Sequence, residues 1–224
     1  EVHAWVRIAS DSAHRDAAVL GKEAVAGRLR GPLHGVPIGI KDIVYTAGIE
    51  TNAGSPLLAG FIPAEDAPVI RNLRAAGAIV LGKTAMTEFA SMDPAATRNP
   101  WKFEHTPGGS SSGSAAAVAA FLAPGTIGTQ TAGSILRPAA YCGVVGLKPT
   151  YEAVDRAGVF PCAWSMDHVG PFARSVEDVA VLFRAMAGMP PATGSDNPGT
   201  QELRVGVAER YFDWSELIQA GASL

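Results

Sequence analysis

The stretch TPGGSSSGSAAAVAAFLAPGTIGTQTAGSILRPAAYCGVVGLKPT, residues 106–150, decides the fold of this chain. It joins a Gly/Ser loop, an alanine-rich apolar run and a second Gly/Ser turn, and it contains no Asp, Glu or His and no basic residue before Arg137. Glycine loses more backbone freedom on folding than any other residue, so such a segment is costly to order. Two Gly/Ser turns around one short buried helix therefore indicate a site that needs backbone N–H groups and hydroxyls close together.

The composition favours a buried sheet covered by helices. The chain has 224 residues, enough for one large domain with a sizeable core, and it is 47% hydrophobic and only 17% charged. Its formal charge of -3 and its scattered basic residues give no electrostatic basis for binding nucleic acid or an anionic membrane. The apolar run 115–123 ends at Pro124, well short of the roughly 18 residues that a membrane span needs.

The cysteines and the chain ends bear on location and completeness. Cys142 and Cys162 are the two cysteines, and no secretory signal precedes them, so we expect reduced thiols in a cytoplasmic protein. The sequence begins at Glu1 without Met and ends soon after a predicted strand at residues 203–207. We expect residues 1–224 to form a single domain that belongs to a longer polypeptide, because a sheet ending there leaves an edge uncovered.

Hydrophobic periodicity predicts helices and strands on both sides of the central stretch. The predicted helices are 12–29, 67–77, 114–122 and 176–187, and the predicted strands are 36–43, 78–83, a strand around Ile127, 144–147 and 203–207. Residues 91–109, with Pro94 and Pro100, form a loop, and residues 190–199 form a linker. A helix followed by a short buried strand, as in 67–83, is typical of parallel sheets. We therefore expect an α/β fold with a mixed, mostly parallel sheet and helices on both faces.

One lysine, Lys41, lies among apolar residues of the predicted strand 36–43. Two interpretations are open. Lys41 is either an edge-strand lysine whose ammonium group reaches solvent, or a buried lysine whose pKa is lowered toward neutrality by desolvation.

The Gly/Ser loop fits two common motifs poorly. Residues 108–113 match the GxxxxG of a phosphate-binding loop, but Ser114 and Ala115 stand where that motif needs Lys and then Ser or Thr. Residues 109–113 also match GxSxG, the nucleophile elbow of α/β-hydrolases, with His168 as a distant candidate base. That elbow must follow a buried strand, whereas FEHTP precedes it here.

A serine activated by lysine explains more residues. Where no histidine is placed to help, a desolvated neutral lysine can act as the base, directly or through a second hydroxyl. Lys41 suits that task, and the turn at residues 131–134 suits the display of backbone N–H groups to an oxyanion beside a serine. The missing bridge is a serine of the Gly/Ser loop.

At these residues the sequence resembles the amidase signature family. Three motifs occur in order, GVPIGIKD at 35–42, TPGGSSSGS at 106–114 and GTQTAGSILRPAAYCGVVGLKPT at 128–150, and the resemblance continues through 167–182. It implies an amidohydrolase with a Ser-Ser-Lys triad that acts through an acyl-enzyme. It calls for no metal and no organic cofactor.

The resemblance also implies a role for individual residues. Ser134 is similar to the acylated nucleophile, Ser110 to the bridging serine behind a cis Gly109–Ser110 peptide bond, and Lys41 to the general base. The implied oxyanion hole consists of the backbone N–H groups of Thr131, Ala132, Gly133 and Ser134, and the implied supporting residues are Ser111, Gly109, Gln130 and Arg137.

Other residues of this region have simpler interpretations. Arg137 either contacts the substrate or braces the loop. Ser112 and Ser114 are expected to be loop and N-cap residues, and Cys142 a core thiol. The chain departs from many family members, which have Asp at the position of Gln130 and Arg directly after the Ser-Ile pair, where Leu136 stands here.

The expected partner is a small-molecule amide, with no nucleic acid bound by the chain itself and no membrane. Homo-oligomers are compatible with the sequence. Two alternatives to a free-standing amidase stay open: the glutaminase subunit of an aminoacyl-tRNA amidotransferase, which needs partner subunits, and an inactive truncated relative that serves as a binding module.

Overall fold

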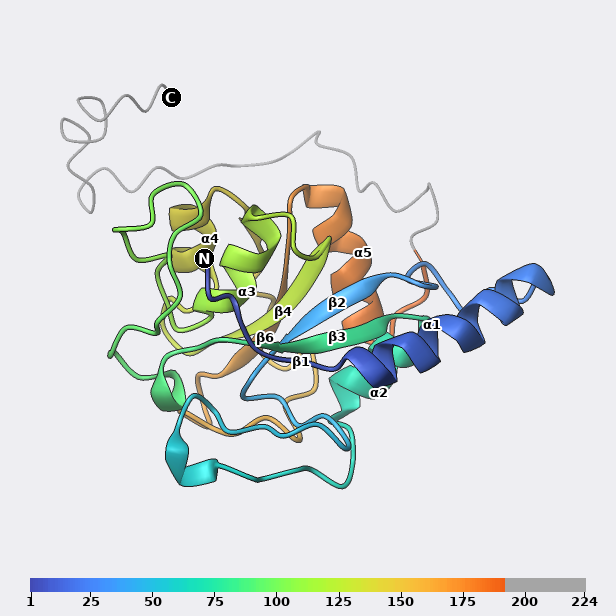
Figure 1. The fold of residues 1–224 in the computed structure, drawn as a ribbon, viewed down its shortest axis with the longest axis horizontal. Helices are drawn as coiled ribbons and strands as arrows, with labels where there is room; N and C mark the ends of the chain where they lie inside the picture. Colours follow the sequence, from blue (N-terminus) through green and yellow to red (C-terminus); the bar gives the residue numbers. More distant parts are fainter. Residues whose placement is uncertain (192–224) are drawn as a thin grey trace. The chain divides into compact units, whose positions relative to one another are not determined.

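The computed structural model describes residues 1–191, and within them six strands form one mixed sheet (Figure 1). The strand order is β1-β3-β2-β4-β6-β5. The strands are β1 (Trp5–Ile8), β2 (Pro37–Lys41), β3 (Ile79–Thr84), β4 (Gly125–Gln130), β5 (Val145–Gly146) and β6 (His168–Ala173). The central strands β3, β2 and β4 are parallel, β1 and β6 join them antiparallel, and β5 pairs antiparallel with β6. The predicted fold class, a mixed sheet with a parallel core, is confirmed.

Helices cover both faces of this sheet, as predicted. The α-helices in the described part are α1 (Ser10–Val25), α2 (Pro68–Ala75), α3 (Ser112–Ala119), α4 (Leu136–Cys142) and α5 (Val176–Met186), with short 3-10 helices at Pro56–Leu58 and Glu88–Ala90. Alternate residues of a strand point to opposite faces. In β6, Val169 accordingly packs in one buried cluster with α2 and α5, and Phe172 in another with α3 and α4.

Small residues and hydroxyls hold α3 close to the sheet. Ser114 Oγ donates to the Ile127 carbonyl at 3.0 Å and lies 2.7 Å from Thr84 Oγ1, and Thr126 Oγ1 donates to the Ser114 carbonyl at 2.9 Å. All residues from 112 to 118 are buried, as predicted, but Phe121 and Leu122 of the predicted helix 114–122 are exposed. The expectation that Ser112 and Ser114 are loop and N-cap residues is wrong, because both lie inside α3.

Helix boundaries differ from the predicted ones for local reasons. The first helix ends at Val25 rather than at residue 29, because Gly27 adopts a left-handed backbone with φ 71°. α3 ends at Ala119 rather than at residue 122, and Phe121, with φ 59°, turns the chain there. The predicted N-cap of α5 is present: Ser175 Oγ accepts from the Asp178 N–H at 3.1 Å.

Three elements, β1, β6 and α4, were not predicted from the sequence. β6 contains Gly170 and Pro171, residues that argue against a strand, but it pairs with β4 over its whole length. α4 carries Pro138 in its first turn, where a missing N–H breaks no helical hydrogen bond. The predicted strand 203–207 lies outside the described residues, as does the linker from residue 192 onward.

Candidate active site

Lys41 ends the central strand β2 and is fully buried. Its Nζ donates to Ser110 Oγ and to Thr129 Oγ1, each at 2.8 Å. Within residues 1–191 no carboxylate lies within ion-pair distance of this ammonium group. Burial removes the charged form from water and lowers the pKa of Lys41 to about 7, while the charges of Cys162 and Asp167 raise it. The interpretation of Lys41 as an edge lysine that reaches solvent is wrong.

A second buried lysine lies on the neighbouring strand. Lys83 of β3 donates to Thr51 Oγ1 at 2.8 Å and to the Val44 carbonyl, and burial lowers its pKa as well. Near it, the Asp42 carboxyl group is buried, which raises its pKa, and its Oδ1 accepts no hydrogen bond from the described residues. Its Oδ2 accepts from the Asn52 N–H at 3.3 Å, in the segment that follows β2.

The Gly/Ser loop brings Ser110 to Lys41 at the start of α3. The Gly109–Ser110 peptide bond is cis, as the resemblance implies. Arg137 Nε and Nη2 donate to the Gly109 carbonyl at 3.1 and 2.9 Å, so the guanidinium group braces the loop. The Thr87 N–H donates to the Ser110 carbonyl at 3.2 Å. The loop is therefore held on both sides of the cis bond.

Ser111 connects the Gly/Ser loop to the strand and the turn behind it. Its Oγ donates to the Thr129 carbonyl at 3.1 Å and accepts from the Thr129 N–H at 3.3 Å. Its own N–H donates to the Ser134 carbonyl at 3.3 Å. Ser111 thus joins the Gly/Ser loop to β4 and to the 131–134 turn.

Gln130 organises the 131–134 turn from its far end. Its Oε1 accepts from the N–H groups of Ile135 and Leu136 at 2.8 and 2.9 Å, and its Nε2 donates to the Ala132 carbonyl at 2.9 Å. The amide therefore satisfies the first N–H groups of α4, which a helix leaves unpaired. Both ends of the amide group are used, so Gln130 is a support of the turn.

The 131–134 turn itself leaves its donors free. Within residues 1–191, the backbone N–H groups of Thr131, Ala132, Gly133 and Ser134 donate to no protein acceptor, and the Ser134 hydroxyl makes no hydrogen bond. Ser134 is 6% exposed, so only a small part of its surface is open to a small molecule. Four free N–H groups beside a free hydroxyl suit the stabilisation of a developing oxyanion.

Asp167 belongs to this site; it is the first residue of the 167–182 segment that carries the resemblance, but the sequence predicted no role for it. Its Oδ1 accepts from Thr131 Oγ1 at 2.5 Å, and its Oδ2 accepts from the N–H groups of Cys162 and Ala163 at 2.8 and 2.9 Å. An Asp at the start of a strand carries no distinguishing signal in one sequence. The strand itself was not predicted, so nothing brought Asp167 near the turn.

The nucleophile-elbow interpretation finds no support. The residues before the Gly/Ser loop form turns rather than a strand. His168 lies with its ring against Tyr151 and its Nδ1 2.6 Å from the Met166 carbonyl oxygen. Its ring makes no hydrogen bond to a serine of the described chain.

The two thiols differ in accessibility. Cys142, at the end of α4, is buried, donates through Sγ to the Pro107 carbonyl at 3.5 Å and has its pKa raised to about 12 by burial. It is the core thiol that the sequence predicts. Cys162 is exposed and lies beside Asp167.

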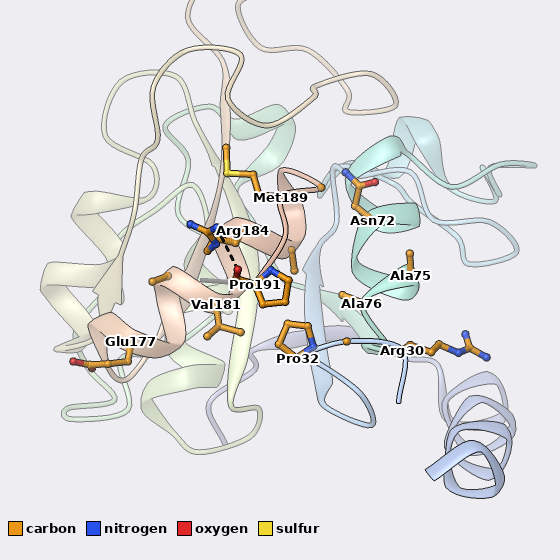
Figure 2. A pocket seen from close by; sticks show the side chains of 14 residues that line it. Arg30, Pro32, Asn72, Ala75, Ala76, Glu177, Val181, Arg184, Met189 and Pro191 are labelled. Atoms are coloured by element: carbon orange, nitrogen blue, oxygen red, sulfur yellow. Dashed lines mark hydrogen bonds between the residues drawn. The ribbon is translucent and has the colours of Figure 1, made fainter. Parts of the chain in front are cut away.

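Cavity size alone does not locate this site. A cavity of about 670 Å³ is lined by residues of α2, α5 and the segments beside them. Figure 2 shows its lining side chains, among them Asn72, Val181 and Arg184. None of the residues around Lys41 lines it. A smaller cavity of about 220 Å³ is bounded by Gly109 and Arg137 and so adjoins the Gly/Ser loop.

Two further observations concern the described residues. None of their helices is both long and apolar enough to cross a bilayer. Nor do residues 1–191 place three or more His, Cys, Asp or Glu side chains where they could hold a metal ion together.

A sequence profile of the amidase family matches residues 1–215. The chain belongs to the amidase family. It is 43% identical over 231 residues to a glutamyl-tRNA(Gln) amidotransferase subunit of Alkaliphilus metalliredigens, across 95% of this chain and 47% of that protein. It is 51% identical over 194 residues to the corresponding protein of Symbiobacterium thermophilum, across 84% of this chain and 40% of that protein.

Solved structures give the same family. The native peptide amidase of Stenotrophomonas maltophilia superposes with a TM-score of 0.80 at 47% identity, across 87% of this chain and 41% of that one. The corresponding glutamyl-tRNA(Gln) amidotransferase subunit of Thermotoga maritima superposes with a TM-score of 0.67 at 41% identity, across 70% and 36%. The chain thus spans less than half the length of the relatives that it matches.

Proposed function

We propose that this chain carries the catalytic centre of an amidohydrolase, in which Ser134 is the nucleophile, Ser110 the proton relay and Lys41 the general base. One observation carries the proposal: a fully buried lysine with a pKa of about 7 lies 2.8 Å from the hydroxyl of Ser110. A base with a pKa near the working pH is the most efficient proton acceptor.

The hydrogen bonds of Lys41 suit its role as a neutral base. A neutral amine has two N–H donors and one lone pair. Thr129 offers two acceptors, Oγ1 at 2.8 Å and its carbonyl oxygen at 3.5 Å. With both N–H groups directed at Thr129, the lone pair of Nζ faces the hydroxyl of Ser110.

The proposed reaction requires the Ser134 hydroxyl, which makes no hydrogen bond in the described residues, to direct its proton to Ser110. Lys41 accepts the proton of Ser110 while Ser110 accepts that of Ser134, and Ser134 Oγ attacks the carbonyl carbon of a small-molecule amide. The free N–H groups of the 131–134 turn stabilise the oxyanion. The proton returns through Ser110 to the leaving nitrogen, the C–N bond breaks and ammonia or an amine departs. Water then hydrolyses the acyl-enzyme by the same relay.

A serine-directed fluorophosphonate tests this centre. We expect the wild-type chain to form one covalent adduct on the peptide that contains Ser134, and Ser134→Ala to lose both the adduct and ammonia release from a panel of primary amides. Ser165→Ala, which changes an exposed serine, is the matched control and should keep both. An adduct that forms on folded Ser134→Ala at the wild-type rate would contradict the assignment.

A second candidate function is that of a component of an amidotransferase. The curated relatives described above are named as subunits of glutamyl-tRNA(Gln) amidotransferase. In this case the chain releases ammonia from glutamine, acts with other subunits and works in the cytoplasm, where aminoacyl-tRNA is made. Turnover of peptide amides by the chain alone favours a free-standing amidase. Turnover of glutamine that depends on added partner subunits favours the second function.

A further inference from the structure

We propose that Asp167 is a positioning residue that fixes the 131–134 turn through the hydroxyl of Thr131. The inference rests on the proposed function, because it assigns to that turn the stabilisation of the oxyanion. Asp167 does not touch the reacting atoms in this proposal and acts through another residue.

The first argument is the hydrogen bonding of one buried carboxylate. Asp167 is 9% exposed and accepts hydrogen bonds from two segments, from Thr131 on one side and from Cys162 and Ala163 on the other. Hydrogen bonds to an ionised acceptor are about twice as strong as neutral ones. The carboxylate therefore joins the 131–134 turn firmly to the segment that precedes β6.

The second argument is the position of Asp167 in the sheet. β4 and β6 pair antiparallel, and Gln130 lies opposite His168 at the end of the ladder. Thr131 directly follows β4 and Asp167 directly precedes β6, so their side-chain hydrogen bond lies just beyond the last backbone pair of the ladder. It holds the chain at the point where the turn leaves the sheet.

The third argument is that the turn is held at both ends while its donors stay free. Asp167 holds the start through Thr131, and Gln130 holds the end through Ile135 and Leu136. Preorganised donors stabilise an oxyanion because they need no reorientation during the reaction. Loosening either end is expected to affect the transition state more than substrate binding.

The anchor on the far side of Asp167 is itself braced. Arg156 Nη1 and Tyr151 Oη both donate to the Trp164 carbonyl, at 2.5 and 3.0 Å, and the Asp167 N–H donates to the Ala163 carbonyl at 3.0 Å. The segment that Asp167 joins to the turn is therefore tied down by contacts that do not involve the turn.

Four variants test the inference: Asp167→Asn, Thr131→Val, Thr131→Ser and the double variant Asp167→Asn/Thr131→Val. The substrate is a primary amide that the wild-type protein turns over. We expect the first two each to lower kcat on the order of 10- to 100-fold with KM changed by less than about 3-fold, since oxyanion contacts act in the transition state. Thr131→Ser keeps the hydroxyl and should retain kcat, and the double variant should be no slower than the slower single variant.

Asp93→Asn, in an exposed loop, is the matched control and should behave as wild type. Wild-type kcat in folded Asp167→Asn, or losses that multiply in the double variant, would overturn the inference. If Asp167→Asn does not fold, Thr131→Val against Thr131→Ser decides, because equal kcat in these two excludes a role for the hydroxyl. A wild-type chain that forms no fluorophosphonate adduct at Ser134 contradicts the proposed function instead.

Discussion

Lys41 is fully buried, and its Nζ lies 2.8 Å from the hydroxyl oxygen of Ser110. An ammonium group at Lys41 Nζ could only donate to Ser110, whereas the neutral amine can accept its proton. With a pKa of about 7, both forms are present near neutral pH. The protonation state of this one amine therefore decides whether the proposed relay runs.

The expected consequence is a pH dependence of acylation. The rate of fluorophosphonate labelling should rise from about pH 6, with a midpoint near the Lys41 pKa of about 7, and level off at higher pH, because only neutral Lys41 accepts a proton. Asp167→Asn should move the midpoint to lower pH, since the Asp167 charge raises the Lys41 pKa. Lys41→Arg, which stays charged, should be inactive at every pH. A labelling rate that does not vary over this range would contradict the role of Lys41.

At the scale of residues, the sequence predicts which groups come together but not how they are held. Lys41 and Ser110 lie in motifs that carry their own chemistry, and the structure places them in contact. The contact between Asp167 and Thr131 depends on the pairing of β4 and β6, which brings two distant segments together. Periodicity in one sequence does not report such pairings.

At the scale of elements, α3 packs so closely on the neighbouring backbone that it leaves no space for an added side-chain atom at Gly113. A Cβ atom added to Gly113 would lie 2.2 Å from the Ala4 carbonyl oxygen and 2.4 Å from the Ala85 nitrogen, both of them backbone atoms. In α1, by contrast, a Cβ atom added to Gly21 would meet no atom within 4 Å. A Gly→Ala substitution would therefore clash with backbone atoms in α3 and meet open space in α1.

We therefore expect opposite effects of Gly→Ala in these two helices. Gly21→Ala should raise the free energy of unfolding by up to about 1 kcal/mol, the difference in helix propensity. Gly113→Ala should lower it by about 1 to 3 kcal/mol, because the backbone must move apart, and should also slow labelling of Ser134. Urea denaturation of both variants measures the effect. Stabilisation by Gly113→Ala would mean that α3 packs less tightly on the sheet than described.

The elements that the sequence did not predict have a common cause. Pro138 in α4 and Pro171 in β6 act as breakers in a local pattern, yet Pro138 stands in the first turn of its helix and Pro171 keeps its place opposite Ile127 in the ladder with β4. Elements with clear periodicity and caps, such as α2 and α5, were predicted to within about two residues. Tertiary pairing thus overrides the local signal at the two prolines.

At the scale of the whole molecule, burial of two lysines makes stability depend on pH. In the unfolded chain a lysine has a pKa of about 10.4 and keeps its proton up to that pH. In the folded chain Lys41 and Lys83 lose it at lower pH. Between these limits the unfolded state binds more protons, so the free energy of unfolding rises with pH.

The expected slope is about 1.4 kcal/mol per pH unit for each lysine that is neutral when folded and charged when unfolded. Urea denaturation from about pH 7.5 to about pH 9.5 should show this rise in the wild-type chain. In Lys41→Met the slope should fall by the share of one lysine, while Lys22→Met, which changes an exposed lysine, should leave it unchanged. Equal slopes in Lys41→Met and wild type would mean that folding does not lower the pKa of Lys41.

Because Cys142 is buried and Cys162 is exposed, the rates at which the two thiols react can report how often the protein opens locally. An alkylating reagent modifies Cys162 at once, whereas Cys142 reacts only in molecules whose α4 has lifted from the layer beneath it. The thiol that is alkylated first, Cys162, therefore gives the total amount of protein. The slow alkylation of the second thiol, Cys142, measures how often α4 separates from the layer beneath it. No probe has to be introduced.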